Sequence, residues 1–181
     1  QLLWDGEIRM TLDCYHDLFI ALSAAVMLIF FILVAYYRSF ILPAAVMSAI
    51  PVCFIGLFPG HWLTGQIFSA TSLIGLVTLT GVLVRNSLLI ADFGTESMRE
   101  GISVREAVLL AGAVRLRPIL LTSLSIIFGS IIMLIDPIFG GLGCSFIFGT
   151  IASTVFTMAL TPVMLYWYYT RWPYKEAKDE E

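Results

Sequence analysis

Long runs of apolar residues, separated by short polar segments, dominate this chain. Five runs approach the length of about 20 residues that a helix needs to cross a bilayer core of about 30 Å. The predicted spans are residues 18–37, 40–63, 67–93, 119–135 and 142–169. None alternates apolar and polar residues as a strand of a membrane barrel does. The pattern therefore predicts an all-α membrane protein with a bundle of five transmembrane helices.

The segment between the third and fourth spans has a helical pattern of its own. Ser103 is followed three residues later by Glu106, a capping-box arrangement that marks the start of a helix. Apolar residues then recur at helical spacing as far as Ala111. We predict that a short amphipathic helix lies here at the membrane interface, in addition to the five spans.

Basic residues predict the orientation of the spans. One side holds eight of the ten: Arg38, Arg99, Arg105, Arg115, Arg117, Arg171, Lys175 and Lys178. The other side holds only Arg9, and Arg85 lies within the third span. The positive-inside rule then places the loop 94–116 and the C-terminus in the cytoplasm, and the turns 60–66 and 136–141 outside.

Composition supports a membrane protein and argues against several other classes. Hydrophobic residues make up 59% of the 181 and charged residues 13%, and the mean hydropathy is +0.93. This charged fraction is about half that of a soluble domain. The three cysteines lie far apart and no histidine has a second ligand nearby, so we expect no metal site and no cofactor. We find no phosphate loop or nucleophile elbow and expect no enzyme, and nothing in the charge implies a nucleic-acid partner.

Two groups of glycines predict local features. Gly56 and Gly60 form a GxxxG pair, which is typical of a close contact between membrane helices. Gly140, Gly141 and Gly143 predict a flexible outer turn that leads into the fifth span.

One charged residue interrupts the third span, in the stretch GVLVRNSLLIADF. An arginine at the bilayer centre costs about 2.5 to 3.5 kcal/mol on insertion scales, and Arg85 cannot escape this cost by losing its proton. Asp92 follows seven residues later on the same helix face, and Thr78 and Thr71 precede Arg85 at the same spacing. Such a polar stripe predicts contact with protein or water rather than lipid. The alternatives are that the threonines bond only to backbone carbonyls, and that Arg85 ties two helices together structurally.

The fourth span carries a similar stripe. Arg115, Thr122, Gly129 and Asp136 are also spaced by seven. Thr122 lies about 7.5 Å beyond Arg117, at a depth similar to that of Arg85, and we expect these two side chains to meet across a helix interface.

The spans contain no interior acidic residue that could neutralise Arg85. Asp92 and Asp136 lie at span ends, and the other carboxylates lie in loops or tails. Because a buried cation without a partner is strongly destabilising, the partner must come from another part of the protein or another chain. Carboxylates beside an arginine within a membrane form a proton-relay constellation, so we interpret these spans as half of such a site.

Four stretches carry a resemblance to a known family. They are YRSFILPAAVMSAIPVCFIG (37–56), ATSLIGLVTLTGVLVRNSLLIADF (70–93), EAVLLAGAVRLRPILLTSL (106–124) and DPIFGGLGCSFIFGTIASTVFTMALTPVMLYW (136–167). Together they closely resemble the C-terminal membrane half of resistance–nodulation–division (RND) efflux permeases.

The resemblance implies a domain organisation and a set of partners. Residues 1–16 would end a periplasmic porter region, 17–171 would form the last five of twelve membrane helices, and 172–181 would be a charged cytoplasmic tail. Family members lie in the bacterial inner membrane and use the proton gradient to export drugs, metals or other small molecules. The implied partners are the missing N-terminal half with its relay carboxylates, two further copies in a homotrimer, a periplasmic adaptor, an outer-membrane channel and lipid.

The resemblance also assigns roles to individual residues. Arg85 stands at the basic position of the family's proton relay and is followed by Asn86, as in the family pattern. Thr122 matches the relay hydroxyl, and Arg115 matches a further basic residue near the inner mouth. With Asp92 from the stripe, these are the candidate site residues. The well-known drug exporters have lysine where Arg85 stands, so a relay here would keep a permanent charge at that position.

A second reading is a truncated or degenerate membrane module that anchors or assembles with a partner and transports nothing. A channel is a weaker alternative, because no filter-like ring of residues is visible. The chain starts at Gln1 without the features of a signal peptide, and we expect it to be a piece of a longer polypeptide. The sequence upstream of Gln1 would separate the permease from the anchoring module.

Overall fold

The computed structural model describes residues 7–172, which form six helices and no strand. These are α1 (Glu7–Tyr37), α2 (Ile41–Met47), α3 (Ile50–Thr64), α4 (Ala70–Arg99), α5 (Val104–Leu134) and α6 (Gly140–Arg171). With α2 and α3 counted as one segment, five are long and apolar enough to cross a membrane. The predicted all-α architecture with five spans is therefore confirmed.

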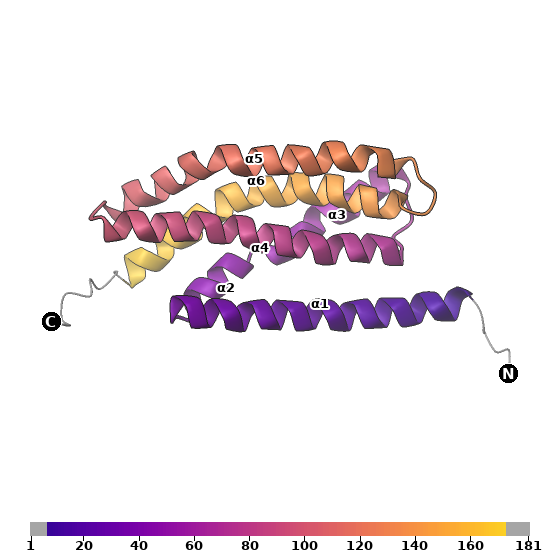
Figure 1. Ribbon diagram of the computed structural model, residues 1–181, viewed down its shortest axis with the longest axis horizontal. Coiled ribbons are helices and arrows are strands. Elements are labelled where there is room, and N and C mark those ends of the chain that lie inside the picture. The colour runs from indigo at the N-terminus through magenta and orange to yellow at the C-terminus, as the bar shows by residue number, and fades with distance from the viewer. Residues whose placement is uncertain (1–6, 173–181) are drawn as a thin grey trace.

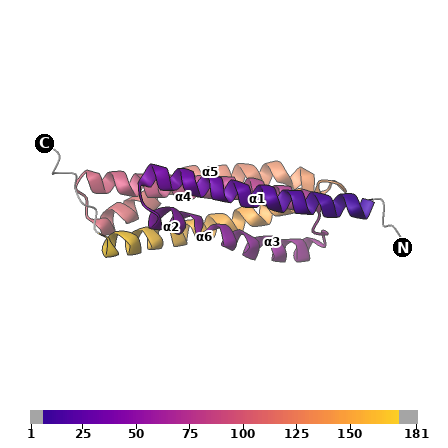
Figure 2. The ribbon, with the colours of Figure 1, turned by 90° about the horizontal axis from the view of Figure 1, so that it is seen from below.

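All helices run roughly along the long axis of the molecule, as Figure 1 shows. Helix α6 packs against α3, α4 and α5, and α4 also packs against α5. Helix α1 lies along one edge of the bundle and makes fewer contacts, mainly with α2 and α4 (Figures 1 and 2). In the most apolar 18-residue stretch of α1, only 6% of the residues are buried against the rest of the bundle. Most of this helix therefore faces lipid or other protein.

The second span is broken into two helices at Pro51. This residue lacks the N–H that would bond to the carbonyl of Met47, and its ring crowds that carbonyl. Helix α2 accordingly ends at Met47, and α3 begins at Ile50 with Pro51 in its first turn.

The fourth span and the predicted interfacial helix form one continuous helix. Ser103 caps α5, and its Oγ accepts a hydrogen bond from the N–H of Glu106, as the capping pattern predicted. The helix then continues through Pro118, and it changes direction along its length in Figure 1. Because α4 extends to Arg99, the connection expected at 94–116 is reduced to residues 100–103.

Close contacts with α6 explain several glycines. A Cβ on Gly56 would meet Ala152 and the backbone of Phe148, and one on Gly60 would meet the Phe148 side chain. The GxxxG prediction is therefore confirmed: the pair lets α3 approach α6 closely.

The prediction of a flexible turn at the glycines 140–143 is wrong. Gly140, Gly141 and Gly143 are buried within the first turn of α6. Substituents on them would collide with side chains or backbone of Gln66, Ser72 and Leu134, respectively, so these glycines serve close packing rather than flexibility.

Hydroxyl groups join the buried faces of α4, α5 and α6. Ser123 and Thr154 share a 2.6 Å hydrogen bond between α5 and α6. Ser145 on α6 donates to the carbonyl of Ser72 on α4 at 3.1 Å. Hydrogen bonds of this kind between membrane helices contribute on average about 0.6 kcal/mol each.

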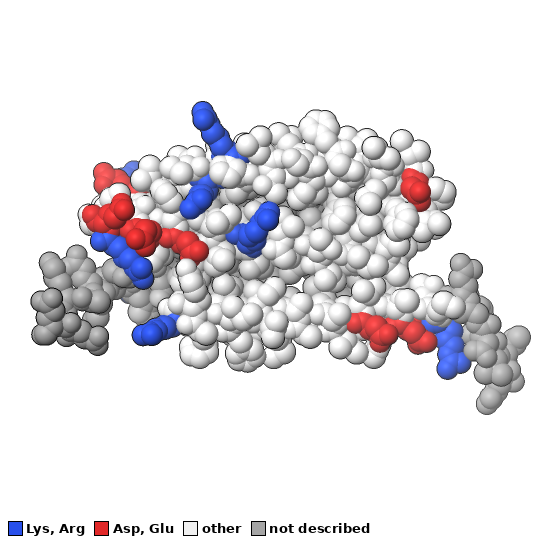
Figure 3. Space-filling model, in the orientation of Figure 1, with Lys and Arg blue, Asp and Glu red and all other residues white. Residues whose placement is uncertain are grey.

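Most charged side chains lie towards the two ends of the bundle, and the surface between them is largely uncharged (Figure 3). The end where α1, α4 and α6 finish carries most of the arginines. Two of the predicted segments, 1–16 and 172–181, lie partly outside the described range, which excludes residues 1–6 and 173–181. Helix α1 begins at Glu7, so it includes most of the segment 1–16 that was assigned to a porter region.

Candidate functional site

Arg85 lies in the middle of α4, fifteen residues after Ala70 and fourteen before Arg99. Either end of the helix is therefore about 20 Å away at 1.5 Å per residue. The side chain is exposed on the surface of the bundle. Within residues 7–172, no hydrogen bond, ion pair or aromatic ring engages its guanidinium.

The surface around Arg85 is a continuous face of α4. Ile74, Thr78, Gly81 and Arg85 follow one another at helical spacing and are all exposed, and we call them the open face. A Cβ added to Gly81 would meet no atom within 4 Å, so nothing in the described chain explains a glycine here. The Thr78 hydroxyl donates to the carbonyl of Ile74 in its own helix at 3.0 Å, which is the backbone role considered as an alternative.

Asp92 does not pair with Arg85. Its Oδ1 accepts a 2.6 Å hydrogen bond from the hydroxyl of Tyr37 on α1. Two helical turns separate Asp92 from Arg85 on α4, and no ion pair joins them in the described chain. The guanidinium therefore lacks the one intrachain carboxylate that shares its face.

Thr122 and Arg85 do not touch, and neither lines the cavity between their helices. A cavity of about 280 Å³ lies between α4 and α5, lined by residues that include Val82 and Ser125. Val82 lies three residues before Arg85, and Ser125 lies three residues after Thr122. Because the two helices are antiparallel, Arg85 and Thr122 lie at a similar level along the bundle, on the same side of the cavity. No hydrogen bond joins Thr122 to Arg85, and the Thr122 hydroxyl instead donates to the carbonyl of Pro118 at 2.9 Å.

Asn86 points away from the open face. It is only 6% exposed, and its neighbour Ser87 is fully buried and accepts a 3.3 Å hydrogen bond from Thr161 on α6. The pair Arg85–Asn86 therefore divides α4 into an open side and a side packed into the bundle.

Arg115 lies in a different place from Arg85 and Thr122. Its guanidinium carbon sits 5.2 Å from the ring centre of Phe93, at the end of the bundle where the arginines gather. Arg115 and Asp92 line one cavity of about 1000 Å³ at this end. The structure thus brings two of the five candidate residues together and leaves the other three elsewhere on α4 and α5.

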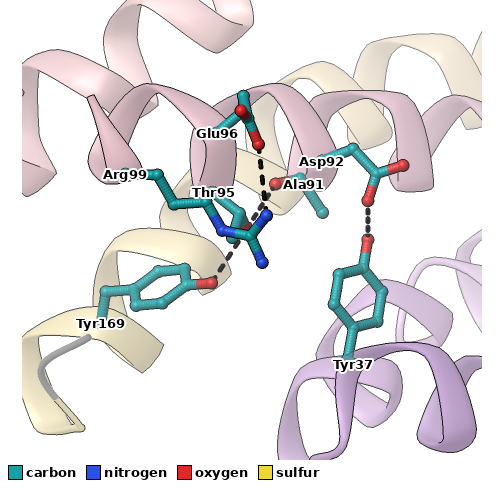
Figure 4. Close-up of polar contacts among 7 residues, drawn as sticks. All are labelled: Tyr37, Ala91, Asp92, Thr95, Glu96, Arg99 and Tyr169. Atoms are coloured by element: carbon teal, nitrogen blue, oxygen red, sulfur yellow. Dashed lines mark hydrogen bonds and ion pairs between the residues drawn. The ribbon is translucent and has the colours of Figure 1, made fainter. Parts of the chain in front are cut away.

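Sequence reasoning missed the aromatic side of this cavity. Figure 4 shows Tyr37 from α1 and Tyr169 from α6 directed towards the same stretch of α4. The Tyr169 hydroxyl shares a 2.9 Å hydrogen bond with Thr95, and Tyr37 bonds to Asp92. The paired tyrosines that end both α1 and α6 were a usable signal, because tyrosine concentrates at membrane interfaces. Among the described residues, no three His, Cys, Asp or Glu side chains come together as metal ligands.

Similarity to known proteins covers almost the whole chain. The profile of the AcrB/AcrD/AcrF family matches residues 1–169. The chain belongs to this family of RND permeases. The match includes Arg85, Thr122 and Arg115, so the site residues lie within the shared region.

Two kinds of AcrB/AcrD/AcrF-family relative illustrate the similarity. The swarming motility protein SwrC of Bacillus subtilis (strain 168) is 33% identical over 159 residues, which is 84% of this chain. The multidrug resistance proteins MdtC of Yersinia pseudotuberculosis serotype O:1b (strain IP 31758) and Yersinia pestis bv. Antiqua (strain Angola) are each 31% identical over 156 residues, or 83% of the chain. The aligned region is only 15% of the length of each relative.

Proposed function

We propose that these spans are the C-terminal membrane part of a proton-driven efflux permease that exports small molecules such as drugs, metals or other hydrophobic compounds. Family membership supports this proposal, as do the relatives whose names state multidrug resistance. The proposal places the protein in a bacterial inner membrane with its C-terminus in the cytoplasm. It works there as a homotrimer with a periplasmic adaptor and an outer-membrane channel.

The observation that carries the proposal is the isolated guanidinium of Arg85. It sits at mid-helix on an open face, and no acceptor in the described chain engages it. A cation in this position needs carboxylates at the same depth, and the rest of the permease is their source.

The charge on Arg85 is permanent, so the carboxylates carry the protons. When these carboxylates are ionised, the guanidinium attracts them, and α4 is held against the helix that bears the carboxylates. Protonation of a carboxylate removes that attraction and lets the two helices separate. Thr122 acts beside this pair, and Arg115 and Asp92 act at its cytoplasmic end. The buried Asn86 packs the turn of α4 that carries Arg85 against the bundle.

Arg85→Ala in the full-length protein tests the proposal. We expect at least a tenfold fall in proton-coupled efflux, measured in proteoliposomes with a pH-sensitive dye and a fluorescent substrate. Arg85→Lys should keep part of the activity, because the positive charge remains, although the ammonium lacks the fork geometry of the guanidinium. Arg105→Gln is the matched control, since it removes an exposed arginine that is not among the site residues.

Normal membrane insertion of Arg85→Ala, shown by unchanged trimer formation and protein level, must accompany the loss. Full efflux by a correctly inserted Arg85→Ala protein would contradict the relay role of this residue. A wild-type protein that moves neither protons nor substrate would instead support the anchoring module.

A further inference from the structure

Helix α6 carries a row of threonines on the face that it buries in the bundle. Its members are Thr150, Thr154, Thr157 and Thr161, and none is more than 6% exposed. They follow one another at intervals of four, three and four residues, which keeps them on one side of the helix. The row covers about 16 Å along the middle of α6, about half of the hydrocarbon core of a bilayer. This threonine row therefore places four hydroxyl groups deep inside a membrane-spanning bundle.

Two members of the threonine row have partners on neighbouring helices. Thr154 and Ser123 of α5 share a hydrogen bond of 2.6 Å. Thr161 donates a hydrogen bond of 3.3 Å to Ser87 of α4. At these two places α6 meets α4 and α5 through small hydroxyl side chains rather than through large apolar ones.

The other two members, Thr150 and Thr157, have buried hydroxyls that no group in the described chain engages. The usual solution for a threonine in this bundle is a bond within its own helix. Six other threonines donate to the carbonyl four residues earlier: Thr64, Thr78, Thr80, Thr95, Thr122 and Thr170. Thr150 and Thr157 make no such bond. Because a buried hydroxyl without a partner is unfavourable, a partner from outside the polypeptide is expected.

Helix geometry sets the distance from each unpartnered hydroxyl to the next member of the threonine row. Side chains three or four residues apart on one helix face have Cβ atoms about 5–6 Å apart. Two hydroxyl oxygens at about this separation are too far apart to bond directly, but one water molecule joins them, since each of its hydrogen bonds measures about 2.8 Å. Thr150 is separated in this way from Thr154, and Thr157 from Thr161. Internal water typically makes about three hydrogen bonds to otherwise unsatisfied polar groups, and the threonine row supplies such groups.

We propose that two internal water molecules bind along the threonine row, between α6 and the facing helices α4 and α5. One bonds to the hydroxyl of Thr150 and bridges it to Thr154. The other bonds to the hydroxyl of Thr157 and bridges it to Thr161. The row then keeps all four hydroxyls hydrogen-bonded at the centre of the membrane without help from a further helix. The proposal does not depend on transport, because it concerns the packing of helices within the described chain.

Unfolding of the full-length protein in mixed detergent micelles tests the site, because valine has the shape of threonine without its hydroxyl. Thr157→Val should raise the ratio of unfolded to folded protein by about threefold, the average effect of losing one hydrogen bond between membrane helices. Thr154→Val, which removes the bond to Ser123, should have an effect of similar size. Thr80→Val is the matched control and should change the ratio less, because the buried Thr80 hydroxyl bonds only to the carbonyl of Leu76 in its own helix.

A Thr157→Val protein that is more stable than the wild type overturns the water site, because removing an unpartnered hydroxyl from a dry contact is favourable. An effect no larger than that of Thr80→Val overturns it as well. Thr157→Ser guards against a packing defect, since it keeps the hydroxyl and should retain the bound water.

Electron cryo-microscopy of the full-length protein gives the direct readout. Density for water within hydrogen-bonding distance of the Thr150 and Thr157 hydroxyls, and its loss beside position 157 in Thr157→Val, supports the proposal. Absence of that density from the wild type, at a resolution that shows ordered water elsewhere in the membrane domain, overturns it.

Discussion

The hydroxyl of Tyr37 donates a 2.6 Å hydrogen bond to the carboxylate of Asp92 and ties the last turn of α1 to α4. A second tyrosine, Tyr15, does the same near the other end of α1 by donating to the carbonyl of Phe68 at 2.6 Å. Helix α1 packs only loosely between these points, so two phenols fix its position along the bundle. The first bond also occupies the carboxylate on α4 that lies closest in sequence to Arg85, which leaves the arginine available to an outside partner.

Tyr37→Phe should destabilise the packing of α1. The substitution removes one donor to a half-buried carboxylate, and we expect a loss of about 1 kcal/mol in unfolding free energy. Steady-state unfolding in mixed detergent micelles measures it. Tyr36→Phe is the control, since its neighbouring phenol is exposed. If Asp92→Ala and Tyr37→Phe prove additive in a double-mutant cycle, the hydrogen bond does not contribute to stability.

Thr122→Ala should reduce efflux by less than Arg85→Ala does. It removes a hydroxyl but leaves the fixed charge in place. Ser125→Ala is a close control, because Ser125 lies one turn away and donates a similar 2.9 Å bond to the carbonyl of Leu121. We expect Ser125→Ala to have little effect on transport rates in proteoliposomes. Equal effects of the two substitutions would show that Thr122 only satisfies the Pro118 carbonyl.

Asp136 should make the turn before α6 sensitive to acid. Its Oδ1 accepts hydrogen bonds from the N–H groups of Ile138 and Phe139, which lower the pKa of this carboxyl below its usual range. The folded state therefore favours the ionised form. The resulting stabilisation is complete above the unfolded pKa of about 3.9 and is lost as the pH falls through the lower folded value.

The Tm difference between wild type and Asp136→Ala should thus be constant near neutral pH and shrink below about pH 4. Glu100→Ala, which removes an exposed carboxylate from the α4–α5 connection, should show no comparable pH-dependent difference. A Tm difference that persists unchanged at pH 3 would contradict this account.

Cysteine labelling should place the connection 100–103 in the cytoplasm. Cys14 is exposed and must first be replaced by serine, whereas Cys53 and Cys144 are buried. An impermeant maleimide should then label Glu100→Cys only after the inner membrane is permeabilised, and Ile138→Cys in intact spheroplasts. The opposite pattern would invert the proposed topology.

Hydropathy predicts the five spans because each is a local property of about 20 consecutive residues. Local signals also predict the Ser103 cap correctly. They fail between the interfacial helix and the span 119–135, which were predicted as separate: one helix continues through Pro118, and Thr122 bonds to the Pro118 carbonyl. Gly140 was misread as part of a flexible turn because its close neighbour Gln66 is distant in sequence.

The sequence predicts those features of the site that lie within one helix, but not the contacts between helices. The charge, depth and face of Arg85 all follow from one segment of sequence. The bond between Tyr37 and Asp92 joins residues 55 positions apart. Predicting it requires knowing which faces of α1 and α4 meet, and a single sequence does not encode that in any local pattern. The same holds for the cavity, whose wall comes from the ends of several helices.

The central position of α6 has a consequence for biosynthesis. This helix covers the buried hydroxyls and glycines of α3, α4 and α5, and it is the last of the six to emerge from the ribosome. Until it leaves the translocon, the hydroxyls of Ser87 and Ser123 lack the partners that α6 provides, Thr161 and Thr154, and they remain exposed to lipid, water or an insertase. Assembly of these spans is therefore a late, concerted event, and a nascent chain arrested before residue 140 should be recognised as incomplete by membrane quality-control proteases.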